Sequence, residues 1–142
     1  MEHSDSIKEI AGALAKAQAG MKAAQMNATN PFLKNKYADL GAVIDAVLKP
    51  LADNGLSITQ PVSSQDGMIS VTTMLMHASG EWISETISLP MGEERGKSLA
   101  QMAGSVITYL RRYSLSSMLG VYADEDTDGN EPKSKSPAEK QP

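Results

Sequence analysis

The clearest candidate for a binding surface is the segment from Lys97 to Tyr122, which contains Lys97, Arg111 and Arg112 and no acidic residue. A solvated helix usually carries charges of both signs, because opposite charges one turn apart support it. A surface of one sign with small polar residues suits a polyanion, since guanidinium groups match the geometry of phosphates. The segment therefore predicts phosphate binding; the alternative is a solvated face whose arginines pair with acids elsewhere.

A second segment combines aromatic and basic side chains, namely Phe32, Lys34, Lys36 and Tyr37. Loops held by a scaffold often carry binding residues. Aromatic rings beside basic side chains are typical of single-strand binding, in which each stacked base contributes about 1–3 kcal/mol. Two lysines in a loop are weak evidence alone, but the chain also contains the basic segment from Lys97 to Tyr122. We therefore predict that this loop makes further contacts to the same ligand.

Tyr109 and Tyr113 flank the arginine pair at a spacing of one helical turn. Tyrosines at the boundary of a core bury their rings and leave their hydroxyl groups in water. We expect this arrangement for both residues, with base stacking as the alternative.

Patterns for catalysis and metal binding are scarce. The chain has no Cys, which excludes disulfides, thiolate metal sites and a cysteine nucleophile. His3 and His77 have no evident acid and serine partners, and the glycine motifs that hold phosphates are absent. The segment Asp124–Gly129 matches the first half of a calcium loop, but Lys135 occupies the position that needs a bidentate Glu. We predict a protein that is not an enzyme, with no metal site and no cofactor.

Hydrophobic periodicity predicts two helices in the first part of the chain. The first runs from Ser6 to Asn27 and begins with a capping box of Ser6 and Glu9. A loop follows it, and the second helix begins at Asp39 as N-cap and ends before Gly55.

The rest of the domain reads as three strands and a long helix. Strand patterns cover Leu56–Pro61, Met68–Ala78 and Glu81–Leu89, and a helix covers Lys97–Leu119. This order predicts an α+β fold: an antiparallel three-stranded sheet with a β-hairpin, packed against the long C-terminal helix and the two N-terminal helices.

The long helix should present one arc to the sheet and the other to the ligand. The arc expected against the sheet contains Leu99, Met102, Ala103, Val106, Ile107, Leu110 and Met118. The opposite arc contains Lys97, Gln101, Gly104, Ser105, Thr108, Arg111 and Arg112.

The formal charge of −4 argues against a nucleic-acid binder until it is divided along the chain. Residues 1–122 carry ten Lys and Arg against eleven Asp and Glu, a net of −1, whereas residues 123–142 carry −3. We interpret 1–122 as the domain and 123–142 as an acidic disordered tail. No apolar run approaches the roughly 20 residues of a membrane span, and the first residues show no secretion signal, so we expect a cytoplasmic protein.

Three stretches resemble the ERF (essential recombination function) family of phage and prophage single-strand annealing proteins. They are Asn30–Leu40 with its K-Y-A-D-L motif, Lys49–Gln60, and Gly104–Leu115 with its G-S-x-I-T-Y-x-R-R-Y motif. The acidic segment Asp124–Gly129 is similar to the one that closes the domain of that family.

The resemblance implies ATP-independent annealing of complementary single-stranded DNA in homologous recombination and repair, by a homo-oligomeric ring or filament in the bacterial host cell. It implies a fold akin to the eukaryotic annealing rings. It places Lys34, Lys36 and Tyr37 on one wall of a DNA groove and directs Arg111 and Arg112 at the strand. A phage exonuclease or a host single-strand binding protein is an expected partner. The alternatives are a single-strand DNA-binding protein that does not anneal, and an oligomeric scaffold that does not bind DNA.

Overall fold

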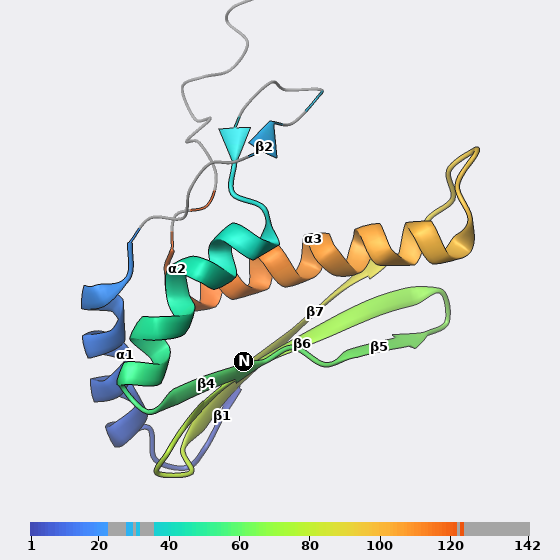
Figure 1. The fold of residues 1–142 in the computed structure, drawn as a ribbon. Coiled ribbons are helices and arrows are strands. Elements are labelled where there is room, and N and C mark those ends of the chain that lie inside the picture. Colours follow the sequence, from blue (N-terminus) through green and yellow to red (C-terminus); the bar gives the residue numbers. More distant parts are fainter. Residues whose placement is uncertain (23–27, 30, 32–35, 122, 124–142) are drawn as a thin grey trace, which may run out of the picture.

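In the computed structural model, three helices lie on one side of an antiparallel sheet (Figure 1). The structure describes residues 1–22, 28–29, 31, 36–121 and 123. The helices are α1 (Lys8–Gly20), α2 (Leu40–Asp53) and α3 (Leu99–Leu119). The strands are β1 (Glu2–His3), β2 (Ala28–Thr29), β3 (Lys36–Tyr37), β4 (Leu56–Thr59), β5 (Val62–Gln65), β6 (Met68–His77) and β7 (Trp82–Pro90). The α+β class and the long C-terminal helix are as predicted.

Helix α1 is shorter than predicted, and the predicted capping box is wrong. Its N-cap residue, Ile7, makes no side-chain cap bond, and the chain becomes extended at Met21. The cap comes instead from the turn between β6 and β7, where a carboxylate oxygen of Glu81 accepts a hydrogen bond from the N–H of Ile10 at 2.8 Å. This hydrogen bond, at the positive end of the helix dipole, lowers the pKa of the Glu81 carboxyl from its ordinary value.

Helix α2 follows the prediction. Its N-cap is Asp39, whose carboxylate accepts a hydrogen bond from the N–H of Ala42 at 2.9 Å. The helix continues through Pro50 to Asp53. Gly55 follows with a φ of +71°, the left-handed conformation that glycine adopts after a helix.

The large sheet has five strands rather than the predicted three, in the order β1-β7-β6-β4, with β5 also paired to β6. β4, β6 and β7 correspond to the predicted strands. The prediction missed β5, although Asp66 and Gly67 join it to β6 in a two-residue turn with φ values of +52° and +77°. An Asp-Gly pair is a strong signal for such a hairpin. β1 pairs only Glu2 and His3 with β7, which is too short for a sequence pattern.

The segment between α1 and α2 also contains regular structure where a loop was predicted. Ala28 and Thr29 pair with Tyr37 and Lys36, which makes the small β2–β3 sheet. Figure 1 shows this pair standing above α2 and α3, on the side away from the large sheet.

Helix α3 packs along the sheet through two apolar clusters. Leu110 packs with Ile69 and Val71 of β6 in one cluster. Leu115 and Leu119 pack in the other cluster, together with residues of α1 and α2. The predicted inward arc is therefore correct along most of the helix. It is wrong at Leu99, which is 67% exposed, because the first turn lies at the end of the sheet farthest from α1 (Figure 1).

Candidate nucleic-acid interface

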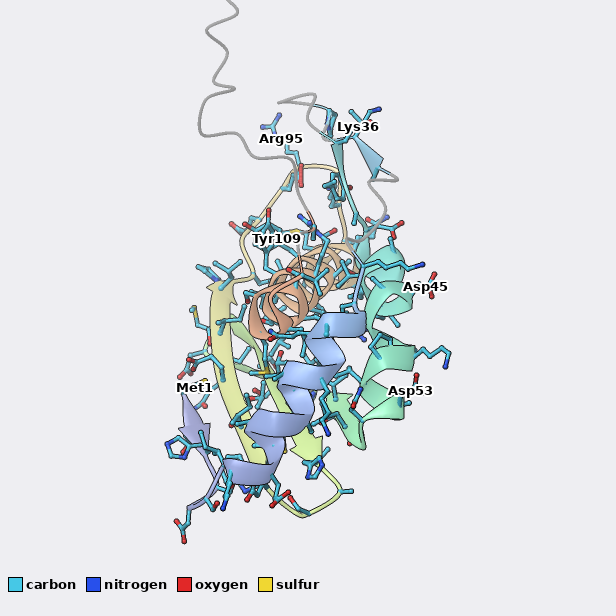
Figure 2. The ribbon with its side chains drawn as sticks, turned by 90° about the vertical axis from the view of Figure 1, so that its left-hand side faces the viewer. Met1, Lys36, Asp45, Asp53, Arg95 and Tyr109 are labelled. Carbon is cyan, nitrogen blue, oxygen red and sulfur yellow. The ribbon has the colours of Figure 1, made fainter. Side chains whose placement is uncertain are left out.

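An exposed side of α3 runs between two segments that rise above the helices, away from the sheet. Figure 1 shows the loop 91–98 at the N-terminal end of α3 and the β2–β3 pair above its C-terminal half. In Figure 2, turned by 90°, Arg95 of that loop and Lys36 of β3 lie on the same upper side. Gln101, Gly104, Ser105 and Thr108 are exposed, and they precede Arg112, whose side chain contacts Tyr37 of β3, at spacings that put them on its side of the helix. We call these four residues the α3 polar face.

Four side chains form a continuous stack beside the C-terminal end of this face, which we call the Tyr–Arg stack. The guanidinium carbon of Arg112 lies 4.6 Å from the ring centroid of Tyr37 and 4.3 Å from that of Tyr113. The ring of Tyr113 lies 4.7 Å from that of Tyr109, with an angle of 52° between the two planes. These distances fit cation–π contacts and a tilted aromatic pair. The stack therefore joins β3 to α3 and has Tyr109 as its outer member.

Arg112 lies inside the protein rather than on the exposed arc where periodicity placed it. It is 9% exposed, and its Nη1 donates a hydrogen bond to the carbonyl oxygen of Ala38 at 3.4 Å. Ala38 is itself buried, and its N–H donates to the carbonyl oxygen of Ala123 at 2.8 Å. The expected exposed position is therefore wrong, because the chain between β3 and α2 covers this side of α3.

The two tyrosines of α3 are exposed rather than buried at the core boundary as expected. Tyr109 is 51% exposed and Tyr113 is 37% exposed. Leu110, between them in sequence, fills the contact with the sheet, so its neighbours along the helix point elsewhere. An exposed ring at the end of a fixed stack is a surface on which another flat group can stack.

Arg111 points to a different side of α3 from Arg112 and is half-buried against the edge of the sheet. Its Nε donates to Oε1 of Gln60 at 3.3 Å, and Nε2 of Gln60 donates to the carbonyl oxygen of Arg111 at 3.1 Å. No carboxylate forms an ion pair with Arg111 within the described ranges. The two adjacent arginines therefore do not share one binding face, and the neutral partner leaves the charge of Arg111 to attract an anion.

The N-terminal end of the α3 polar face is less basic than predicted. Nζ of Lys97 lies 3.0 Å from Oε2 of Glu94 in an exposed ion pair, which offsets its charge. Gln101 closes a capping box with Ser98: its side-chain oxygen accepts the Ser98 N–H at 2.8 Å, and the Ser98 hydroxyl accepts the Gln101 N–H at 3.1 Å. The amide nitrogen of Gln101 is then the group that could reach a ligand.

Two of the predicted contacts, Phe32 and Lys34, lie outside the described residues, as does the acidic segment 124–142 with its calcium-loop pattern. Lys36 is exposed on β3.

Sequence reasoning missed Arg95. It follows two glutamates, so the surrounding sequence gave no basic signal. In the structure its side chain is exposed on the loop beside the α3 polar face, and no ion pair joins it to a carboxylate among the residues described. Only the position of the loop relative to α3 could have selected it.

In the part of the chain that the structure describes, the histidine considered for catalysis lies away from this face. His77 lies in the β6–β7 turn, where its Nδ1 accepts the N–H of Ser79 at 3.1 Å and lies 2.8 Å from the Ser79 hydroxyl. A hydrogen bond from the amine of Met1 lowers the pKa of the Glu85 carboxyl, which lies on β7. No group of three or more His, Asp or Glu side chains in the described part of the chain is placed to hold a metal ion. The described residues on this side of α3 offer exposed aromatic, cationic and neutral hydrogen-bonding groups.

Comparison with known proteins decides the family. The model of the ERF superfamily matches residues 10–142. This chain belongs to the ERF superfamily. No curated protein and no solved structure matches it. Membership supports a recombination-related function of phages in general terms. Among the helices that the structure describes, none is long and apolar enough to cross a membrane.

In this ERF protein, two of the motifs that carry the resemblance meet in space. The K-Y-A-D-L motif supplies Tyr37 and Ala38, and the motif in α3 supplies Tyr109, Arg112 and Tyr113. The Tyr–Arg stack and the bond from Arg112 to the Ala38 carbonyl join them. Residues of the two motifs therefore contact each other and fix the position of β3 relative to α3.

Proposed function

We propose that this ERF protein binds single-stranded DNA along the α3 polar face and anneals complementary strands without ATP during phage or prophage recombination. The observation that carries the proposal is the Tyr–Arg stack, whose outer ring, Tyr109, is 51% exposed. Stacking on an aromatic ring tolerates every base, because each base has a π-face. This property suits a protein that must hold any sequence.

Cations around the α3 polar face supply the contacts to phosphate in this proposal. Lys36 and Arg95 are exposed on the two bordering segments, and Arg111 is half-buried at the sheet edge. Lys97 joins them after exchanging Glu94 for a phosphate oxygen, and Lys34 belongs to the same segment as Lys36. Thr108 and the amide nitrogen of Gln101 offer neutral contacts. Arg112 acts through the stack by positioning Tyr37 and Tyr113.

Annealing needs a strand whose backbone is neutralised and whose bases are accessible, and it includes no covalent step. Binding by one copy is modest, since the face is short and part of its charge is offset. A homo-oligomer raises the affinity by linking equivalent sites, which increases their effective concentration without new contacts. A phage exonuclease or a host single-strand binding protein remains a proposed partner of such an assembly.

The decisive test replaces Tyr109 by Ala, with Tyr109→Phe as the matched control. Loss of one stacked base weakens binding by about 1–3 kcal/mol, which corresponds to roughly 5- to 150-fold in Kd. Fluorescence anisotropy with a labelled oligonucleotide should show this loss for Tyr109→Ala and near-normal binding for Tyr109→Phe. Equal binding by all three proteins would contradict the assigned surface.

A fluorescence assay of annealing between complementary oligonucleotides, run without ATP, separates the alternatives. Acceleration of pairing supports the proposal, whereas binding that slows pairing would identify a protective single-strand binding protein. Absence of binding at low salt would favour a scaffold that does not use DNA. Contacts from Lys34, Lys36, Arg95, Lys97 and Arg111 to five phosphates predict a slope of about −3.5 for log K against log salt concentration.

A further inference from the structure

The two edges of the large sheet differ in how they are protected against pairing with another chain. An open edge presents unpaired N–H and C=O groups, and natural proteins usually block it with lysines, prolines, bulges or covering segments. One edge of this sheet is β7 with β1, and the other is β4 with β5.

The β7 edge is blocked along most of its length. β1 pairs with it at Ile83 and Ser84, and the hydroxyl of Ser4 accepts the N–H of Trp82 at 3.0 Å. Farther along, the N–H of Thr86 donates to Oε1 of Glu85 at 3.1 Å. The strand then ends at Pro90, which has no N–H.

The opposite edge is one continuous strand in register. β4 and β5 are separated by Gln60 and Pro61, and their partners on β6 are separated by the same number of residues, Thr72 and Thr73. The N–H of Thr72 donates to the carbonyl of Pro61 at 3.0 Å. The missing N–H of Pro61 interrupts the ladder towards β6, which explains the break between β4 and β5.

The direction of the backbone hydrogen bonds decides which residues of β4 and β5 face the open side of the sheet. Residues of an antiparallel strand direct their N–H and C=O alternately to one neighbour and to the other. The bonds from Ala78 to the Gly55 carbonyl and from Thr72 to the Pro61 carbonyl direct those residues towards β6. The outward positions are therefore Leu56, Ile58, Gln60, Val62 and Ser64. All five can both donate and accept, because the proline faces inward.

The side chains of this edge offer no protection either. Leu56–Gln65 contains no Lys, Arg, Asp or Glu, and no other strand pairs with β4 or β5 in the described ranges. Val62 is 44% exposed. Long, uncharged, unpaired edges of this kind are templates for strand addition.

We propose that a second copy of this chain pairs antiparallel along the β4–β5 edge, with Gln60 on the two-fold axis. This register sets Ile58 opposite Val62 and Leu56 opposite Ser64, so all five outward positions exchange backbone hydrogen bonds with the partner. It covers the exposed Val62 with an apolar residue, and the paired strands themselves carry no charged residue. Such an interface is self-complementary and closes at two copies, which would make the dimer the unit of any larger assembly.

The absence of Cys allows a clean cross-linking test on the purified protein alone. In the proposed register Ser57 lies opposite Ser63 at a non-hydrogen-bonded position, where Cα atoms are about 4.5 Å apart and a disulfide fits. A mixture of Ser57→Cys and Ser63→Cys should form covalent dimers on mild oxidation, and neither variant should do so alone. Cross-linking of a single variant alone, or none in the mixture, would overturn the register.

A proline substitution tests the edge without disturbing the fold. Val62→Pro removes an outward N–H and leaves the bonds to β6, whereas Val62→Ala keeps that N–H. Sedimentation should show at least a tenfold weaker dimer for Val62→Pro than for Val62→Ala, with both variants equally helical by circular dichroism. Equal dimerisation by the two variants would refute the proposal. Arg111, a proposed phosphate contact, bonds to Gln60 of this edge, so the Tyr109→Ala variant gives the separate report on the proposed function. Tyr109→Ala should form the dimer normally while its binding of oligonucleotides weakens.

Discussion

Replacing Arg112 by Ala should destabilise the fold rather than merely remove a contact to DNA. The guanidinium group lies against the rings of Tyr37 and Tyr113 and donates to the Ala38 carbonyl in a site where Arg112 is 9% exposed. A cation–π contact contributes about 1–2 kcal/mol when it is largely desolvated. The hydrogen bond is long at 3.4 Å and adds little. We therefore expect a loss of about 2–4 kcal/mol in the free energy of unfolding.

This loss is large against the roughly 5–15 kcal/mol that stabilise a typical domain. It corresponds to a fall in Tm of about 10 °C for a chain of this size. Urea denaturation followed by the fluorescence of Trp82, the single tryptophan, measures it directly. Arg112→Lys should lie between Ala and the natural residue, since it keeps the charge and loses the planar stacking group.

Arg111→Ala is the matched control, because Arg111 is half-buried and its side chain bonds to Gln60 at 3.3 Å. Its removal should cost less than about 1 kcal/mol, while strand binding weakens. The reasoning fails if Arg112→Ala unfolds at the same urea concentration as the natural protein. That result would mean that the stack contributes nothing to the position of β3.

Two further predictions concern the ends of α1 and α3. Glu81→Gln should destabilise the protein at neutral pH and lose its effect in acid. Because the pKa of Glu81 is lowered in the folded protein, its carboxylate stabilises the fold at pH values above the ordinary pKa of 4.5, and this stabilisation is lost as the pH falls through the lowered pKa. The unfolding free energies of both proteins, measured between pH 7 and pH 3, check this expectation. A difference between them that persists in acid contradicts the cap. Gly120→Ala should cost about 1–2 kcal/mol, because Gly120 has a φ of +73° and its added Cβ would lie 3.2 Å from Nε2 of Gln18. Gly12→Ala in α1 is the control, since nothing lies within 4 Å of the added atom there, and it should raise the Tm; equal melting shifts for the two variants would show that the left-handed conformation is not the cause.

Local patterns in the sequence were sufficient for the elements whose determinants lie close together along the chain. The N-cap of α2 at Asp39 and the alternation of β6 follow from periodicity and from capping within one turn. The strand β5 was also accessible, through Asp66 and Gly67. In each case the residues that decide the structure are separated by a few positions.

The cap of α1 could not be predicted in this way. Its acceptor is Glu81, which is distant in sequence from Ile10 and reaches it only when the β6–β7 turn packs below the helix. A capping box within the helix was a reasonable expectation from Ser6 and Glu9, but the tertiary partner is the one that forms the bond. The exposure of Leu99 could not be predicted for the same reason: helical periodicity does not show where the sheet beneath α3 ends.

The sequence by itself determined the class of the fold, the family and the side chains available for binding an anion. The tertiary structure decided how those side chains are used. Helical periodicity describes one helix and does not show which neighbour covers each side, so it could not distinguish Arg112, covered by the chain before α2, from Tyr109, which is exposed. Burial depends on all the packed elements together. It makes Arg112 a residue that positions its neighbours, and it leaves Tyr109, three positions earlier, exposed for contact with a ligand.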